Sequence, residues 1–304
     1  MRQHEDRQAI TTEGLTKSYG QIQALRGIDL TVPAGTVFGL LGPNGAGKST
    51  LIKALVGALR PTAGRVRVLG LDPLRNRAES RQGIGYMPQA PALYDDLSAR
   101  DNILFFGRAH DAQLSPARVD TVLALTELSA RAADPVRTYS GGMQRRVSLA
   151  CALVHEPRIL FLDEPTAAVD PVLRARFWRT FRELAARGVT LFISTHLMDE
   201  ALLCDRVAVV RDGALMICDT PHAILARGKT RVLVRRDGAS DEQTVGSRPE
   251  DVALALHRYG LAPDVTAVAV EADTLEAVIF GMITQRSDGI IGATGATGAT
   301  EGAA

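Results

Sequence analysis

The residues from Gly42 to Ser49 have the types and spacing of a loop that binds phosphate groups. They read GPNGAGKS, which fits G-x-x-x-x-G-K-[ST], and they lie between an apolar run, Val37 to Leu41, and a helical pattern that opens at Lys48. Glycines let successive backbone N–H groups turn inward as an anion cradle, and the helix start adds partial positive charge. Lys48 can reach the β and γ phosphates, while Ser49 offers a hydroxyl to Mg²⁺. The motif predicts a site for a nucleoside triphosphate with magnesium.

A second apolar run ends in two adjacent carboxylates. Arg158 to Glu164 reads RILFLDE, which is typical of a buried parallel strand whose carboxyl end emerges at a ligand crevice. We expect Asp163 to bind Mg²⁺, directly or through water, and Glu164 to polarise the water that attacks the γ-phosphoryl group. Two adjacent acids alone would favour a solvated turn, so this interpretation depends on the phosphate loop upstream.

Several short strands must position these residues. Apolar or β-branched runs alternate with helical patterns, which indicates a largely parallel α/β sheet. The expected strands are Thr36 to Leu41, Val66 to Leu69, Ile84 to Met87, Ile159 to Leu162, Thr190 to Ser194 and Val207 to Val210, and the expected helices include Ser49 to Leu59 and Leu173 to Arg187. Between Ser98 and Arg137 the strand signals disappear and apolar residues recur at helical spacing, which predicts a helical subdomain.

A second, smaller domain is expected after Gly228. The pattern there restarts as the strand Thr230 to Arg235, a loop from Asp237 to Ser247, the helix Pro249 to Tyr259, the strand Val265 to Glu271 and the helix Thr274 to Ile283. The tail contains GATGATGAT, a glycine period too short and too poor in proline for a collagen helix. We therefore expect a nucleotide-binding domain at 1–229 with its helical subdomain at about 90–157, a C-terminal domain at 230–283 and a disordered tail at 284–304.

Composition excludes several classes of protein. The chain of 304 residues has 35 basic and 34 acidic residues, so no overall field favours nucleic acid or an anionic membrane surface. The three cysteines, Cys151, Cys204 and Cys218, are odd in number and widely spaced, which argues against a disulfide framework or a zinc site. They are interpreted as buried thiols in a reducing compartment.

Neither a secretory signal nor a membrane span is expected from the sequence. Met1 to Ile10 is polar and carries both charge signs, without the apolar stretch of a signal peptide. Leu30 to Gly47 is free of charge, but two prolines and several glycines interrupt it. We expect a cytoplasmic chain that docks onto a partner if its function involves a membrane.

Further motifs, in a fixed order, accompany the phosphate loop and the acidic strand. Together they resemble the ATP-binding subunits of ABC transporters over about Thr12 to Lys229, and their order separates that family from other P-loop ATPases. The motifs are Gln89 in YMPQ, Ser140-Gly141-Gly142 in YSGGMQRR, the D-loop AAVDP at Ala167 to Pro171, and His196 in STHLMDEA, with Tyr19 where the family stacks an aromatic ring on adenine.

The resemblance implies an α/β fold of the P-loop NTPase class. Its RecA-like core would carry an antiparallel β subdomain and an α-helical subdomain, followed here by a small C-terminal α+β domain. It implies Glu164 and His196 as catalytic residues and Ser49, Gln89 and Asp163 as Mg²⁺ ligands. The residues expected to contact ATP are Tyr19, Gly42, Pro43, Asn44, Gly45, Ala46, Gly47, Lys48, Ser49, Thr50, Gln89, Ser140, Gly141, Gly142, Met143 and Asp170.

The resemblance also implies a homodimer around two ATP molecules. Ser140-Gly141-Gly142 precedes a helical pattern through Leu153, so it should form a second anion-binding helix start. In the family, this start and the phosphate loop of another subunit lie on opposite sides of one ATP. His196 follows the strand Thr190 to Ser194 and should emerge at the same crevice as Glu164, where it could hold the γ-phosphate and the attacking water in line.

Two motifs depart from the common family pattern. Tyr139 and Met143 replace the outer residues of the usual LSGGQ, and Met143 lacks the amide of a glutamine. Ala167 and Ala168 stand in the D-loop where serine and glycine are frequent, which removes a hydroxyl. The backbone cradle is unaffected, so we expect activity to be retained.

The wording of the motifs is similar to the exporter branch of the daunorubicin-resistance type (ABC-2). The variant SGGM, the run STHLMDEA and TLEAVIF at Thr274 to Phe280 carry this resemblance. It implies an integral membrane permease as a separate partner and a location on the inner face of the cell membrane. An importer ATPase, or a non-transport ABC ATPase in translation or DNA repair, remains the alternative.

Other classes fit less well. A Rossmann oxidoreductase would need G-x-G-x-x-G after the first strand, and only Gly83 and Gly85 suggest part of it. A regulatory module without catalysis would have lost Glu164 or His196. The arginines at 174, 176, 179 and 182 are interpreted as a solvated helix face, so no nucleic acid partner is expected.

Overall fold

The computed structural model describes residues 8–167, 169–236, 239–259 and 264–282. Its contacts divide the chain into two compact units, one ending at Cys218 and the other beginning at Asp219. The helix α9 (Pro221–Leu225) therefore groups with the second unit, although the sequence places the domain boundary at residue 229. The expected tail at 284–304 lies outside the described residues.

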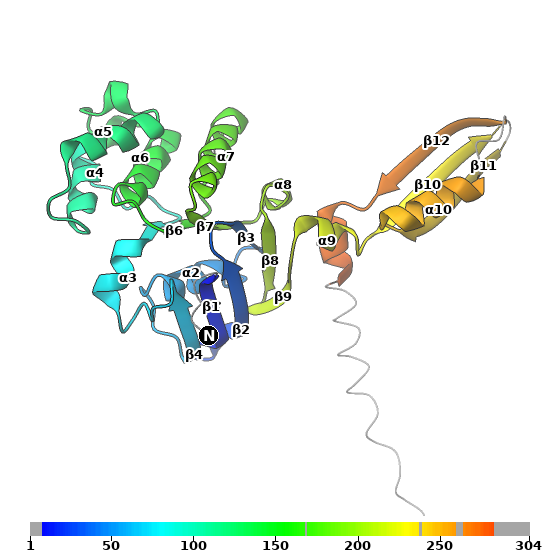
Figure 1. The fold of residues 1–304 in the computed structure, drawn as a ribbon, viewed down its shortest axis with the longest axis horizontal. Helices are drawn as coiled ribbons and strands as arrows, with labels where there is room; N and C mark the ends of the chain where they lie inside the picture. The colour runs from blue at the N-terminus through cyan, green and yellow to red at the C-terminus, as the bar shows by residue number, and fades with distance from the viewer. Residues whose placement is uncertain (1–7, 168, 237–238, 260–263, 283–304) are drawn as a thin grey trace, which may run out of the picture. The chain divides into compact units, whose positions relative to one another are not determined.

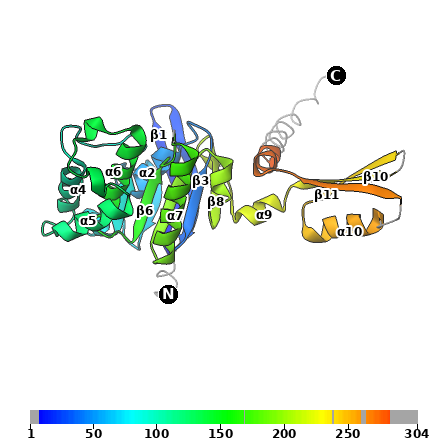
Figure 2. The same cartoon turned by 90° about the horizontal axis from the view of Figure 1, so that it is seen from above.

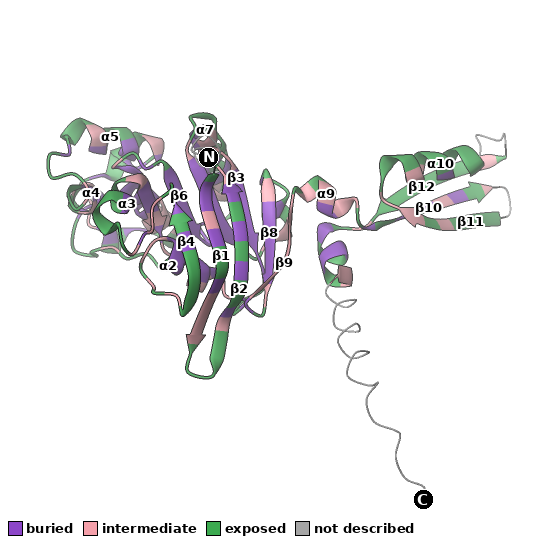
Figure 3. Cartoon of the chain, turned by 60° about the horizontal axis from the view of Figure 1, so that its bottom comes forward, coloured by how far each residue is buried: buried purple, intermediate pink, exposed green. Residues whose placement is uncertain are grey.

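The first unit is built on a sheet of six strands in the order β5-β6-β7-β3-β8-β9. These strands are β5 (Ile84–Met87), β6 (Ile159–Asp163), β7 (Thr190–Thr195), β3 (Val37–Leu41), β8 (Arg206–Arg211) and β9 (Ala214–Asp219). The pairs β5/β6, β6/β7, β7/β3 and β3/β8 are parallel. Every residue of β3, β6 and β7 is buried, as expected for parallel strands covered on both faces (Figure 3).

A second, antiparallel sheet has the order β2-β1-β4, formed by β1 (Gln8–Tyr19), β2 (Ile22–Pro33) and β4 (Ala63–Val68). The helix α2 (Lys48–Leu55) shares one apolar core with both sheets, to which Leu25, Phe38 and Leu51 belong. α2 ends at Leu55, four residues before the expected end at Leu59, and Val56 is its C-cap. The helix α7 (Pro171–Ala186) contacts β7 and β3, and Figure 2 shows it on the face of the sheet opposite α2.

The helical subdomain lies at one end of this unit (Figure 1). It comprises α4 (Ala99–Arg108), α5 (Pro116–Leu125), the 3₁₀ turns Ser129–Arg131 and Val136–Thr138, and α6 (Gly141–Leu153), and α3 (Arg77–Gly83) leads into β5. Ser98, Ser115 and Ser140 cap α4, α5 and α6, each accepting a hydrogen bond from a backbone N–H three residues later. The core, antiparallel sheet and helical subdomain confirm the expected α/β fold of the P-loop NTPase class.

The second unit contains an antiparallel sheet in the order β11-β10-β12, with α10 (Pro249–Tyr259) packed against β10 and β11. Its strands are β10 (Lys229–Arg236), β11 (Ala239–Gly246) and β12 (Val265–Ala272), and residues 275–282 are helical. The expectation of a loop from Asp237 to Ser247 is wrong, because most of that segment is β11. The segment is polar and forms a sheet edge, so it shows none of the apolar alternation from which strands are predicted.

Candidate active site

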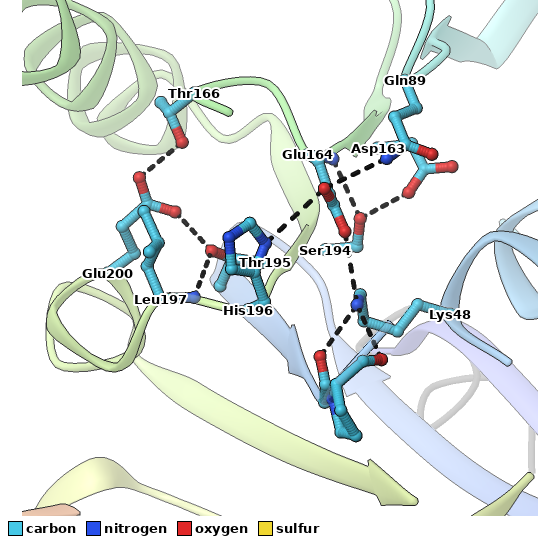
Figure 4. Close-up of polar contacts among 12 residues, drawn as sticks. Lys48, Gln89, Asp163, Glu164, Thr166, Ser194, Thr195, His196, Leu197 and Glu200 are labelled. Atoms are coloured by element: carbon cyan, nitrogen blue, oxygen red, sulfur yellow. Dashed lines mark hydrogen bonds and ion pairs between the residues drawn. The ribbon is translucent and has the colours of Figure 1, made fainter. Parts of the chain in front are cut away.

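Four segments that carry expected site residues meet at one edge of the central sheet. Gln89 follows β5, Asp163 ends β6, His196 follows β7, and the loop from Gly42 to Gly47 follows β3. These strands are neighbours and parallel, so their carboxyl ends point to the same edge. Figure 4 shows the resulting cluster of polar side chains.

The loop from Gly42 to Gly47 is shaped by close backbone contacts. Gly47 has φ +101° and precedes α2, and a Cβ there would lie 2.6 Å from the Ala24 carbonyl oxygen. A Cβ on Gly42 would lie 2.3 Å from the Val210 carbonyl oxygen. Only glycine fits either position without movement of the backbone.

Lys48 opens α2 and is buried, with 5% of its surface exposed. Its Nζ donates to the carbonyl oxygens of Gly42, at 2.8 Å, and Pro43, at 3.2 Å. It faces a cavity of about 240 Å³, and this cavity is lined by Ala24, Asn44, Gly45, Gly47, Lys48, Ser49, Thr50, Gln89 and Glu164. The cavity brings together residues that the sequence assigned separately to the phosphate loop, to Gln89 and to the acidic strand end.

The Glu164 carboxylate contacts three of the other expected site residues. Its Oε1 lies 3.3 Å from Lys48 Nζ, and its Oε2 accepts a hydrogen bond from Gln89 Nε2 at 3.1 Å. His196 Nδ1 lies 3.6 Å from the same Oε2. A carboxylate that is 7% exposed needs such partners, because burial without them would cost several kcal/mol.

The backbone of Glu164 is held in an uncommon conformation. Its φ is +49°, a region that residues other than glycine rarely adopt. The N–H donates to Ser194 Oγ at 2.9 Å, and the carbonyl accepts from Arg145 Nη1 at 3.0 Å. These bonds compensate the strain, which is the kind of arrangement found at functional sites.

Asp163 is connected to the same cluster through Ser194. It is 1% exposed, and its Oδ1 accepts a hydrogen bond from Ser194 Oγ at 2.5 Å. Burial, with the negative charge of Asp163 as a smaller cause, raises the pKa of Tyr86 to about 12.

The donor set at this edge fits magnesium. Hydroxyl, amide and carboxylate groups of Ser49, Gln89 and Asp163 are hard donors, which Mg²⁺ prefers. Within the described residues no cluster of three His, Cys, Asp or Glu side chains could hold a metal alone. Mg²⁺ is typically bound by one or two carboxylates together with substrate phosphates, so the site fits a metal that arrives with the nucleotide.

Several residues that are expected to contact the nucleotide do not line this cavity. Tyr19 is 48% exposed at the end of β1, where Lys17 Nζ lies 4.9 Å from its ring centroid. The residues Ser140 to Met143 form the cap and first turn of α6, and Asp170 caps α7 by accepting from the N–H groups of Val172 and Leu173. None of these lines the cavity at the phosphate loop of the same chain.

Sequence reasoning missed the residues that hold Glu164 and its neighbours in place. Ser194 bridges Asp163 and the Glu164 backbone, and Arg145 ties α6 to Glu164. Glu200, with 1% exposure, binds two threonines near the site. Ser194 and Thr195 lie at the end of a strand, directly before His196. That position is a signal in the sequence that could have drawn attention to both residues.

The fold and this site define a P-loop NTPase of the cassette type. The sequence model of the family described as ABC transporter matches residues 25–167. Daunorubicin resistance ATP-binding protein DrrA3 of Streptomyces coeruleorubidus is 39% identical over 291 residues, which are 93% of this chain and 86% of that protein. The chain therefore belongs to the ABC transporter family.

Other relatives have related names. Nod factor export ATP-binding protein I of Sinorhizobium fredii (strain NBRC 101917 / NGR234) is 42% identical over 71% of this chain and 64% of that protein. The protein named "Probable multidrug ABC transporter ATP-binding protein YbhF", from Escherichia coli (strain K12), is 41% identical over 82% of this chain. The chain spans 42% of the length of that relative.

Solved structures give the same fold. The dimeric post-hydrolysis state of the ATP-binding cassette MJ0796 bound to ADP and Pi has a TM-score of 0.65 and 26% identity, covering 69% of this chain and 98% of that chain. The cbiO1 protein from Clostridium perfringens, part of the complex cbiONQ, has a TM-score of 0.65 and 31% identity, covering 72% and 91%.

Proposed function

We propose that this chain hydrolyses ATP to drive export through a separate membrane permease, as the ATPase subunit of an ABC-2-like transporter. The observation that carries the proposal is the convergence of Lys48, Gln89 and His196 on the buried carboxylate of Glu164. Relatives named for drug resistance, multidrug transport and Nod factor export support the direction of transport.

The residues divide the chemical work. The amides of the phosphate loop and the ammonium group of Lys48 stabilise charge on the β and γ phosphates. When a triphosphate competes for Lys48, the Glu164 carboxylate is freed to accept a hydrogen bond from the attacking water. His196, 3.6 Å from the same carboxylate, is placed to hold the γ-phosphate and the water in line. Magnesium, bound through Ser49, Gln89 and Asp163, would neutralise phosphate charge.

Two copies complete each site in this proposal. Ser140 and Gly141 are exposed at the start of α6, where the N–H groups of the first turn attract anions. Because this helix start does not line the phosphate-loop cavity of its own chain, it is available to the triphosphate bound by a second copy. The homodimer would therefore close around two ATP molecules, with Asp170 and the D-loop near the junction.

The permease would bind where the core meets the helical subdomain. A cavity of about 770 Å³ lies there, lined by residues that include Lys53, Arg81, Tyr86, Phe106, His110 and His155. Its mixed apolar and basic lining suits a short segment of a partner protein. No helix among the described residues is long and apolar enough to cross a bilayer, so the chain would act as a peripheral subunit on the inner face of the cell membrane.

The dimer is tested with Glu164→Gln, which keeps the shape of the side chain and removes the base. We expect this variant to sediment as a dimer with ATP and Mg²⁺ and as a monomer without them. The double variant Lys48→Ala, Glu164→Gln serves as the control and should remain monomeric in ATP. A Glu164→Gln variant that binds ATP and stays monomeric at all protein concentrations would contradict the proposal.

A further inference from the structure

Glu200 is a buried carboxylate outside the predicted site, in the short helix α8 (Met198–Ala201), and it is 1% exposed. Each of its oxygens accepts a hydrogen bond from a different threonine: Oε2 from Thr195 Oγ1 at 2.6 Å, and Oε1 from Thr166 Oγ1. Arg174 Nε, on α7, lies 3.8 Å from Oε1. Two hydroxyl donors and a nearby guanidinium compensate much of the cost of burying this charge.

In the sequence, the two threonines lie within two residues of the two proposed catalytic residues. Thr195 directly precedes His196, and its Oγ1 also accepts a hydrogen bond from the Leu197 N–H at 3.1 Å. The backbone on both sides of His196 is thereby fixed to one hydroxyl group. Thr166 lies two residues after Glu164, on the segment that leads into the D-loop (Figure 4).

The Glu200 carboxylate therefore connects two segments of the site that are far apart in the sequence. One segment ends β7 and carries His196, and the other follows β6 and carries Glu164. Ser194 makes a similar connection one residue earlier, because its hydroxyl binds the Glu164 N–H and Asp163. Together these bonds set the distance between the imidazole and the carboxylate, which is 3.6 Å from His196 Nδ1 to Glu164 Oε2.

We propose that Glu200 is a positioning residue that holds His196 in register with Glu164 for hydrolysis. The proposal rests on the roles proposed above for those two residues. Glu200 does not contact the phosphate-loop cavity, so it affects the chemical step and leaves nucleotide binding to Lys48 and its loop. A small misplacement of a catalytic group can cost about 100-fold in rate.

The test begins with Glu200→Gln, which has the same shape but presents an N–H group to one of the two threonine hydroxyls. We expect kcat for ATP hydrolysis to fall about tenfold or more, while KM for ATP changes by less than about twofold. In a His196→Ala background, the same substitution should cause little further loss, because Glu200 acts through His196.

A conservative pair tests the same connection without altering the buried charge. Thr195→Ser keeps the hydroxyl and should keep most of kcat, whereas Thr195→Val removes it and should lower kcat as Glu200→Gln does. Thr12→Val is the matched control, since Thr12 is 4% exposed and its hydroxyl donates to the Ile28 carbonyl at 2.8 Å in the antiparallel sheet. It should lower the melting temperature without lowering kcat.

Several results would overturn the inference. They are a normal kcat in both Glu200→Gln and Thr195→Val, an equal loss in Thr12→Val, or a full additional loss in the His196→Ala background. If Glu200→Gln does not fold, the comparison of Thr195→Ser with Thr195→Val decides. If kcat fell in His196→Ala but not in the Glu200 and Thr195 variants, this inference alone would be wrong. If the wild-type chain did not hydrolyse ATP, the proposed function would be wrong as well.

Discussion

The Lys48 ammonium group is held by two carbonyl oxygens and by the carboxylate of Glu164. This ion pair has a double consequence at the scale of single residues. It places the positive charge at the cavity before a phosphate group competes for it, and it restrains the proposed base. The pair is buried, so removing either partner leaves an uncompensated charge.

Lys48→Ala should lower ATP hydrolysis about 100-fold or more, because it removes the full positive charge from the phosphate site. The measurement is steady-state turnover, together with ATP affinity by calorimetry. Lys53→Ala is the matched control, since Lys53 lies on the same helix and is exposed. If Lys48→Ala kept a turnover within a few fold of the wild type, the role of Lys48 in binding phosphate would be contradicted.

A substitution at Gly42 tests the close approach between its backbone and the Val210 carbonyl group. In Gly42→Ala the new Cβ would lie 2.3 Å from the Val210 carbonyl oxygen, so β3 and β8 must shift apart. We expect the free energy of unfolding, measured in urea, to fall by about 1–3 kcal/mol. Gly141→Ala has no atom within 4 Å of the new Cβ and should change the free energy of unfolding far less. Equal stability of the two variants would contradict the packing argument.

The sequence points to the proposed catalytic and phosphate-binding residues more clearly than to the residues that position them. Lys48 and Glu164 are recognisable because a loop and a strand end of fixed composition surround each of them. Glu200 and Ser194 have common side chains, and each has a partner at least thirty residues away in sequence, Thr166 for Glu200 and Glu164 for Ser194. Hydrogen bonds of this kind depend on the register of neighbouring strands, which local sequence does not specify.

At the scale of elements, two helices of the helical subdomain meet through a stacked pair of histidines. His110 follows α4 and His155 follows α6, with ring centroids 3.8 Å apart and an interplanar angle of 7°. His155 Nε2 lies 3.0 Å from the Ile84 carbonyl oxygen. The pKa of His155 is lowered to about 4, chiefly by burial; the charges of His110 and Arg118 also lower it, and the hydrogen bond to the Ile84 carbonyl acts in the opposite direction. Burial also lowers the pKa of His110.

These lowered pKa values predict a loss of stability in mild acid. Between about pH 6.5 and pH 4 the unfolded chain binds more protons than the folded chain, so the free energy of unfolding falls as pH falls. His155→Phe keeps an aromatic ring and removes the titrating group. Between pH 7 and pH 5 the wild type should lose about 1–2 kcal/mol more than this variant in urea unfolding. Parallel loss in both proteins would assign the acid sensitivity to other groups.

Elements were predictable where burial imposes a pattern and unpredictable where pairing is remote. β6 and β7 lie within a residue or so of their expected bounds because every residue in them is apolar or buried. The sequence predicts a loop in place of β11 because Ala239–Gly246 is polar. The segment is an edge strand, and its conformation comes from pairing with β10. The sequence supports the start of α4 and α5 through the caps Ser98 and Ser115.

At the scale of the whole molecule, the chain consists of two units with separate cores. The second unit has a small core around Val232, Val234 and Ala255, and every residue at the candidate active site belongs to the first. The resemblance to a family predicted the architecture of the first unit because motif order is fixed there. It offered little for the second unit, whose stability depends on a few buried side chains.

Val232→Asp should therefore unfold the second unit and leave ATP turnover intact. Val232 is 0% exposed, and an ionised carboxylate at that position costs several kcal/mol, which a core this small cannot offset. Calorimetry should show the loss of one unfolding transition, with turnover within about twofold of the wild type. Val268→Asp, at a position 44% exposed on β12, is the matched control and should preserve both transitions. Loss of turnover in Val232→Asp alone would mean that the folded second unit supports the active site, because the two variants differ only in whether the new charge is buried.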